Sequence, residues 1–340
     1  MRTPGGRSVV FRPRTVLAVL VCLLVASAAS VLAIGSGDYP MSPDQVLRTL
    51  AGRGAVADTF VVNELRLPRV VTALLVGAAL GLGGAVFQAV VRNPLGSPDI
   101  LGFTQGAATG ALVAIIVLGG GSAALAGGAV VGGILTGALI YLLAWREGIH
   151  GYRLVLVGVG CMAILTGVNG YLLTRAEITE ASRAVLWMTG SLDGRGWEHT
   201  HPLAWGLVVL VPVVLFGCAR ALRMMEMGDE AAYALGVRVE RVRLGLLASA
   251  VLLVSLAAAA AGPVGFVALT APQLARRLTR APGPNLVPAL CLGAALLVSA
   301  DLVAQRLFGA RELPVGVVTG LVGGGYLVWL LARERKVGRI

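Results

Sequence analysis

Residue types that carry out chemistry are scarce in this chain of 340 residues, and their spacing argues against an enzyme. Lys336 is the only lysine, so the chain lacks the Gly-Lys-Ser/Thr loop that would give it an ATP site of the Walker type. The four cysteines lie in or at the ends of apolar runs without CxxC pairing, which is typical of packing residues. No apolar run carries a His, Cys and Asp cluster for zinc or haem. We therefore expect no catalytic residue, no metal and no cofactor bound by this chain.

One ionisable residue lies clearly within a long apolar run. Asp301 is the kind of residue from which proton relays are built, and it would suit transport driven by an ion gradient. Its place near the outer end of the run, close to Arg306, favours instead a paired structural carboxylate. The sequence leaves both interpretations open.

Residues 227–239, MGDEAAYALGVRV, form a charged island between apolar runs, which we call the docking segment. Asp229 as a cap, followed by Glu230, and Gly236 at the far end predict a short exposed helix that stops sharply. A short helix held at the membrane surface between two spans suits a soluble partner that drives transport. The arginines around it place it in the cytoplasm by the positive-inside rule. They are Arg220, Arg223, Arg238, Arg241 and Arg243.

The elements that hold these residues are predicted to be membrane helices. Hydrophobic residues make up 57% of the chain and charged residues 13%, whereas charged residues are about a quarter of a soluble domain. The net charge of +11 comes from arginines between apolar runs, so topology explains it and no nucleic-acid partner is expected. We predict an all-α, polytopic membrane protein embedded in lipid, with ten transmembrane helices and both termini cytoplasmic.

The predicted domain organisation is a single membrane unit. A basic N-terminus (1–14) precedes the ten-helix domain (15–332), which contains a cytoplasmic loop (219–243), and a tail (333–340) follows. Gly77, Gly81 and Gly84 put small residues on one face of the second span, which allows close helix packing. Pro263 and Pro272 are expected to break the eighth span at both ends. The predicted spans are 15–34, 66–91, 100–118, 123–145, 154–174, 202–218, 244–261, 262–273, 286–307 and 313–331.

Several stretches together resemble the FecCD-type permeases of bacterial ABC importers for iron-siderophores, haem and vitamin B12. They are RLPR at 66–69, QAVVRNPLGSPDILG at 88–102, DEAAYALGV at 229–237, GPVGFVALTAPQLAR at 262–276 and ELPVGVVTGLVGGGYLVWLL at 312–331. The resemblance implies a type II ABC importer permease fold with a pathway between two permease subunits. It also implies an ABC ATPase dimer below, which carries ATP and Mg, and an extracytoplasmic substrate-binding protein above.

The same resemblance assigns residues to three roles. The ATPase-coupling residues are Asp229, Glu230, Ala231, Ala232 and Gly236. The arginines that would dock the binding protein are Arg66, Arg69 and Arg306. Asn93 and Leu95 match the cytoplasmic gate. Departures from the family pattern favour a siderophore importer over the B12 importer. They are Gln273 in place of histidine, Gly323 to Gly325 in place of Gly-Ala-Pro, Gly151 and Tyr152 in place of small hydroxyl residues, and Gln305 in place of a docking arginine.

The sequence therefore predicts the permease subunit of an ATP-driven importer of ferric siderophore. A proton-coupled secondary transporter is the alternative, vitamin B12 or haem are alternative substrates, and a purely structural membrane anchor is a third class. The partner permease is either a second copy or a similar chain.

Overall fold

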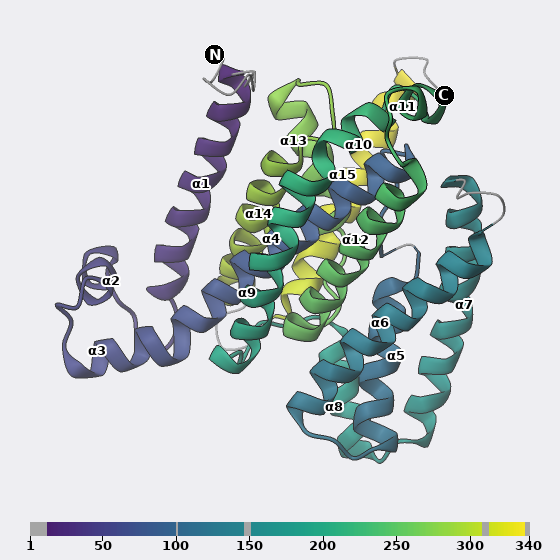
Figure 1. Cartoon of the computed structure of the whole chain (residues 1–340). Coiled ribbons are helices and arrows are strands. Elements are labelled where there is room, and N and C mark those ends of the chain that lie inside the picture. The colour runs from purple at the N-terminus through teal and green to yellow at the C-terminus, as the bar shows by residue number, and fades with distance from the viewer. Residues whose placement is uncertain (1–11, 100, 146–150, 308–312, 337–340) are drawn as a thin grey trace.

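The computed structural model describes residues 12–99, 101–145, 151–307 and 313–336, and every regular element within them is a helix (Figure 1). The expected all-α class is confirmed. Three π-helical stretches, Val61–Arg66, Val113–Val117 and Val213–Cys218, continue α3, α5 and α9. The helices are α1 (Pro13–Ile34), α2 (Pro43–Leu50), α3 (Val56–Phe60), α4 (Leu67–Val91), α5 (Phe103–Leu112), α6 (Ser122–Ala144), α7 (Gly151–Arg175), α8 (Ile178–Met188), α9 (Trp197–Pro212), α10 (Ala219–Met225), α11 (Asp229–Ala234), α12 (Val239–Ala261), α13 (Val267–Thr279), α14 (Leu286–Arg306) and α15 (Val315–Lys336).

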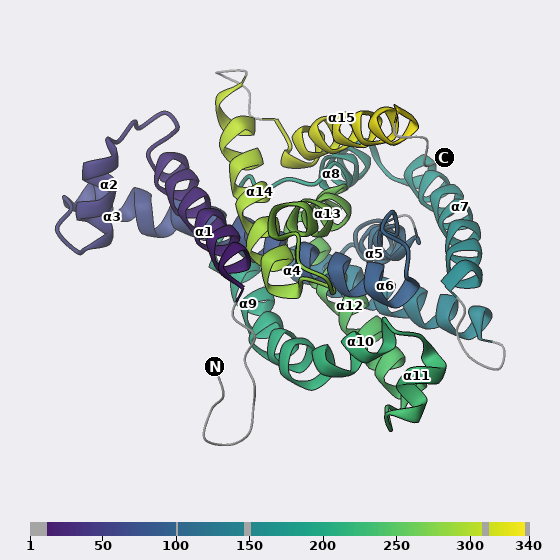
Figure 2. The same cartoon turned by 90° about the horizontal axis from the view of Figure 1, so that it is seen from above.

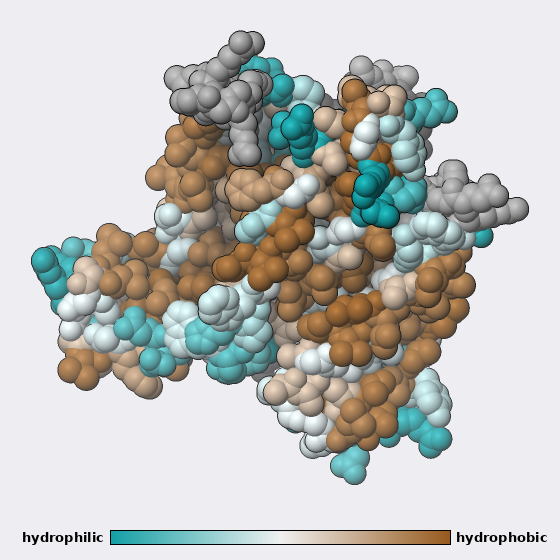
Figure 3. All heavy atoms as spheres, viewed as in Figure 1, coloured by the Kyte–Doolittle hydropathy of each residue, from teal (hydrophilic) through white to brown (hydrophobic). Residues whose placement is uncertain are grey.

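The helices make this a multi-pass membrane protein. Seven described helical segments are long and apolar enough to cross a bilayer, since about 20 apolar residues span the hydrocarbon core. Two further apolar helices, Phe103–Val117 and Val315–Trp329, are shorter, and α13 has 13 residues. Apolar side chains cover broad areas of the face in Figure 3. The seven segments are Pro13–Ile34, Val56–Val91, Ser122–Ala144, Gly151–Arg175, Trp197–Met225, Val239–Ala261 and Leu286–Arg306.

Two predicted end segments lie partly outside the described residues. Of the N-terminal stretch 1–14, only residues 12–14 are described, and α1 begins at Pro13. Of the tail 333–340, residues 333–336 continue α15. The start of α1, the end of α15, α10 and α11 lie at the same end of the bundle (Figure 1).

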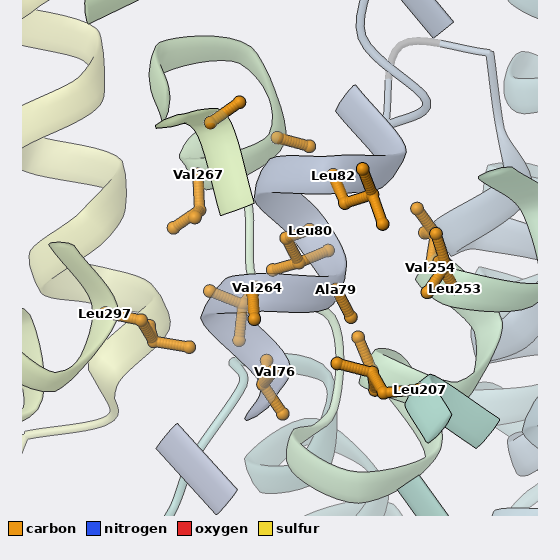
Figure 4. Packing of buried hydrophobic residues seen from close by; sticks show 14 of the residues in the cluster. Val76, Ala79, Leu80, Leu82, Leu207, Leu253, Val254, Val264, Val267 and Leu297 are labelled. Atoms are coloured by element: carbon orange, nitrogen blue, oxygen red, sulfur yellow. The ribbon is translucent and has the colours of Figure 1, made fainter. Parts of the chain in front are cut away.

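The centre of the molecule is α4, around which α9, α12, α13 and α14 pack (Figure 2). Most of its side chains are buried, so it presents no face to lipid, and its apolar residues meet those of its neighbours (Figure 4). The residues seen there are Val76, Ala79, Leu80 and Leu82 of α4, Leu207 of α9, Leu253 and Val254 of α12, Val267 of α13 and Leu297 of α14. Since the rest of the bundle is arranged about α4, a displacement of this helix would disturb every helix that touches it.

The small face of α4 permits this packing, as predicted. A Cβ atom on Gly77 or Gly81 would collide with a backbone carbonyl of α14, and one on Gly84 would collide with the carbonyl of Ala268 in α13. Backbones that approach this closely gain van der Waals contact that larger residues would prevent.

The prediction that Pro272 breaks the eighth span is wrong, because Pro272 lies inside α13 and is buried. A proline there has no N–H to donate to the carbonyl four residues earlier, which is that of Ala268. This is the carbonyl that lies against Gly84 of α4. The helix therefore tolerates Pro272, because the Ala268 carbonyl that lacks a helical donor packs against a glycine of the neighbouring helix.

Candidate functional site

The docking segment forms α11, a helix of six residues that links α10 to α12. Its end agrees with the prediction: Gly236 follows with φ of +82°, a conformation that glycine adopts without strain. The prediction of Asp229 as the cap is wrong. The capping position belongs to Gly228, and Asp229 is the first helical residue. The Asp229 side chain has other partners.

Asp229 is held between two arginines from different helices. Its Oδ1 accepts from Nη2 of Arg92 at 2.5 Å, and its Oδ2 accepts from Nη2 of Arg243 at 2.8 Å. Arg243 is buried and also donates to Oε1 of Glu240 at 2.8 Å. Burial raises the pKa of Asp229, but the hydrogen bonds and charges of the two arginines outweigh it and leave that pKa lowered. The carboxylate therefore stays ionised at neutral pH and ties α11 to α4 and α12.

Arg92 connects this cluster to the predicted gate residues. It ends α4 in the left-handed conformation, with φ of 55°, and a second hydrogen bond runs from its Nη2 to the Met225 carbonyl of α10 at 2.7 Å. The gate residues Asn93 and Leu95 follow at once. The structure thus brings the docking segment and the gate residues together through one side chain. Sequence reasoning assigned Arg92 no role, although a basic residue directly after a membrane helix was the available signal.

The turn that carries the gate residues is fixed at two points. The Asn93 side chain accepts from the Leu95 backbone N–H at 2.9 Å, which closes a local turn. Nε2 of Gln273 on α13 donates to the carbonyl of Pro94. Gln273, a departure from the family pattern, therefore holds the turn at residues 93–95 against α13. Leu95 itself is exposed.

The predicted coupling residues differ in burial: one is buried in the chain and the others reach its surface. Ala232 is buried and packs with Met225 and Val239, so it anchors α11 and offers no surface to a partner. Glu230 and Gly236 are exposed, and Ala231 is half-buried. Sequence reasoning did not single out the apolar residues beside them, Tyr233 and Leu235, which are also exposed.

Two of the three arginines predicted to dock a binding protein hold the loop between α1 and α2. Arg66 donates to the carbonyls of Ile34 and Tyr39 at 2.7 and 2.8 Å. Arg306 donates from Nε to Oγ of Ser36 at 2.9 Å. Both guanidinium groups are therefore engaged within the chain at the end of the bundle opposite α11.

The third arginine, Arg69, forms a bidentate ion pair with Asp301. Its Nε and Nη2 lie 3.1 and 3.0 Å from the two carboxylate oxygens, and Gln305 donates to the same carboxylate at 2.7 Å. Asp301 is only 1% exposed. The expected pairing of Asp301 is found, with Arg69 on α4 rather than Arg306 as its partner. Asp193, on the loop before α9, lies 3.9 Å from Arg69 and faces solvent.

A metal site is not found in the described part of the chain, where no three His, Cys, Asp or Glu side chains gather closely enough to bind an ion. The polar contacts described above are ion pairs and hydrogen bonds between helices, and such contacts can hold helices in place and release them.

Known transport proteins resemble this chain over most of its length. A model of the FecCD transport family matches residues 13–333. The chain is 46% identical over 320 residues to the ferric enterobactin transport system permease protein FepG of Escherichia coli, covering 93% of this chain and 97% of the relative. It is 38% identical to the achromobactin transport system permease protein CbrC of Dickeya dadantii, covering 94% and 93%. A solved metal-chelate type ABC transporter in an inward-facing conformation superposes with a TM-score of 0.80 at 28% identity, covering 94% of this chain and 99% of that one.

Proposed function

The chain belongs to the FecCD transport family, and on that premise we propose that it is the permease subunit of an ATP-driven importer that carries a ferric siderophore across the cytoplasmic membrane. It is a transport subunit and not an enzyme. The assignment of a ferric siderophore as substrate rests on the 46% identity to a permease for ferric enterobactin, which extends over nearly the whole of both chains. The chain's own site residues are compatible with this role because they join helices rather than react.

In this proposal the ATPase binds to α11. Glu230, Tyr233 and Leu235 supply an exposed charge and two exposed apolar groups, while the buried Ala232 fixes the helix to the body of the permease. When the ATPase subunits close on ATP and Mg, α11 moves with them. Arg92 then carries the displacement to α4 and to the turn of Asn93 and Leu95, which changes access at the inner face.

The topology that goes with this role has ten crossings and both termini in the cytoplasm. Its support is that each of the ten predicted spans overlaps a helix, and that the start of α1, the end of α15 and α11 share one end of the bundle (Figure 1). The proposed domains are the N-terminus 1–14, the membrane domain 15–332 with its coupling loop 219–243, and the tail 333–340.

Two further partners complete the proposed assembly. A second permease subunit, identical or homologous, would cover α7, on which Gly160, Gly167 and Gly170 have no neighbour near the Cβ position. A substrate-binding protein would dock at the opposite end from α11, where Arg66, Arg69 and Arg306 lie. Since those arginines are engaged within the chain, we expect them to shape the docking surface more than to reach across it.

The proposal is tested by purifying the tagged chain in mild detergent and identifying the chains that accompany it. An ATPase chain and a second permease are expected. Uptake of iron-labelled siderophore in a strain that lacks the gene should return with the wild-type chain and stop on ATP depletion. Uptake that survives ATP depletion and is abolished by a protonophore would favour the proton-coupled alternative.

A further inference from the structure

A cavity of about 620 Å³ lies at the same end of the bundle as α11, and its residue Glu226 also lines a second pocket with Arg92 and Pro94. The start of α1, α10 with the π-helical turn before it, and residues 281–288 at the start of α14 form its walls. Figure 2 looks onto this end of the molecule. The wall combines charged and apolar side chains. The charged ones are Arg12, Arg223 and Glu226, and the larger apolar ones are Leu215, Phe216, Leu286 and Val287.

The charged groups of this cavity are mostly without close partners. Arg12 reaches the carbonyl of Pro282 at 3.5 Å, the limit of a hydrogen bond. Arg223 lies on α10 and Glu226 three residues later, just after its end, and within the described chain neither side chain makes a hydrogen bond or a close ion pair. Burial raises the pKa of Glu226, and the more distant charges of Arg223 and Arg276 lower it in part. Two guanidinium groups and one carboxylate thus face a shared space that the protein does not fill.

The apolar side of the cavity faces the surroundings of the bundle. Phe216 is 85% exposed and lies within the apolar segment Trp197–Met225, and Val287 is 43% exposed and lies at the start of the apolar segment Leu286–Arg306. A soluble protein would hide such residues, but at a membrane surface they meet hydrocarbon. The cavity therefore offers charges at its polar end and contact for acyl chains at its flank, which is the pattern of a lipid-binding pocket between membrane helices.

We propose that this cavity binds the headgroup of a phospholipid that carries both a phosphate and a primary ammonium, the phosphatidylethanolamine class. Arg12 and Arg223 would bind the phosphate by charge-assisted hydrogen bonds, and Glu226 would accept from the ammonium. A purely anionic headgroup has no ammonium from which the Glu226 carboxylate could accept a hydrogen bond. The acyl chains would lie along Phe216 and Val287. The inference rests on the proposed topology, which places this end of the bundle at the inner surface of the membrane.

A lipid in this place would touch α10 directly before the docking segment. Arg223 and Glu226 lie on and just after α10, and Met225 between them is the residue whose carbonyl binds Arg92. The lipid would therefore stabilise the position of α10 on which the contact between the docking segment and α4 depends.

The test measures lipid retained by the full chain with its partners. The complex is reconstituted in nanodiscs of equal parts phosphatidylethanolamine, phosphatidylglycerol and phosphatidylcholine, extracted in mild detergent, and its bound lipids are quantified by mass spectrometry. Enrichment of phosphatidylethanolamine is expected for the wild type. Arg223→Gln and Arg12→Gln should each lower that enrichment about 10-fold, the loss expected for one hydrogen bond to a charged group. Arg220→Gln, which removes an exposed charge of α10 outside the cavity, is the matched control.

Glu226→Gln decides the identity of the headgroup. It should abolish the preference for phosphatidylethanolamine over phosphatidylglycerol while total bound lipid stays the same. Equal enrichment in Arg223→Gln, Arg12→Gln and Arg220→Gln would overturn the site, and a preference for phosphatidylglycerol in the wild type would overturn the assigned class. Complete displacement by soluble glycerophosphoethanolamine, which lacks acyl chains, would assign the cavity to a soluble phosphate compound instead.

This outcome is separable from that of the proposed function. Loss of lipid enrichment with an ATPase chain still bound would refute only the lipid site. Lipid enrichment in a chain that never copurifies with an ATPase would refute only the importer.

Discussion

Arg92 and Asp229 are 137 positions apart in the sequence, yet their side chains form an ion pair in which Nη2 of the arginine lies 2.5 Å from Oδ1 of the aspartate. The pair joins the first residue after the central helix α4 to the first residue of α11. Because Asn93 and Leu95 follow Arg92 directly, any movement of α11 that preserves this pair displaces the proposed gate turn as well.

Weakening this pair should uncouple transport from ATP hydrolysis. Asp229→Asn removes the charge that attracts both Arg92 and Arg243, so we expect siderophore uptake to fall about 5-fold or more while the ATPase still copurifies. Asp44→Asn is the matched control, because Asp44 pairs with Arg48 on an exposed helix far from α11. Uptake and ATP hydrolysis measured on the same proteoliposomes would check this. Unchanged uptake in Asp229→Asn would contradict the coupling role.

The contact should not depend on pH near neutrality. The pKa of Asp229 is lowered in the folded chain, so its ionised form stabilises the structure above the ordinary value of 3.8, and this contribution is lost only as pH falls through the lowered pKa. Hydrogen exchange of residues 228–236, corrected for the chemical exchange rate, should show equal protection at pH 5 and pH 8. Loss of protection between these values would show that another group controls the segment.

The Arg69 and Asp301 pair should contribute to stability rather than to proton transport. Asp301→Ala removes the bidentate carboxylate partner of the largely buried Arg69 guanidinium, a change that costs up to about 3–5 kcal/mol and should appear as a drop in the melting temperature. The double variant Arg69→Met with Asp301→Leu removes both charges and should recover much of that loss.

Uptake separates the two transport mechanisms at the same residue. Asp301→Asn keeps hydrogen bonding but cannot carry a proton, so an ATP-driven importer that folds should retain uptake. Abolished uptake in a variant with a normal melting temperature would instead favour proton coupling.

The close approach of α4 and α13 should be sensitive to a single methyl group. Gly84→Ala places a Cβ against the Ala268 carbonyl and should destabilise the fold by about 1–3 kcal/mol. Gly83→Ala is the control, because its Cβ would meet only side-chain and backbone atoms at ordinary contact distances of 3.4 Å and more. Thermal unfolding in detergent compares the two, and equal melting temperatures would show that the helices can separate without loss.

Much of the fold was predictable because it depends on local pattern. Apolar runs gave the helices, and the glycine spacing at 77, 81 and 84 gave the packing face of α4. The error at Pro272 arose because helix propensity ignores tertiary contacts: the carbonyl that the proline leaves without a helical donor lies against a neighbouring glycine. Only the packed structure shows that this position accepts a proline.

The site was predictable at the level of segments but not of partners. The charged composition of 227–239 marked the docking segment, and its sharp end at Gly236 followed from residue type. Asp229 was predicted to cap the helix because an aspartate at a helix start often does so through nearby backbone N–H groups. Its actual partners, Arg92 and Arg243, lie 137 and 14 positions away in the sequence. Likewise Asp301 was expected beside its neighbour in sequence, Arg306, and it binds Arg69 on another helix. Ion pairs between helices depend on the packing of the bundle, which single-sequence patterns do not encode.

Both ends of α4 carry an arginine that pairs with an aspartate of another segment. Arg69 and Arg92 are separated by 23 residues of continuous helix, about 35 Å at 1.5 Å per residue. The surface that would bind a substrate-binding protein and the surface that would bind an ATPase therefore lie at opposite ends of one buried helix. Close backbone contacts surround this helix and resist its bending. A displacement at one membrane surface would therefore be transmitted along α4 to the other surface.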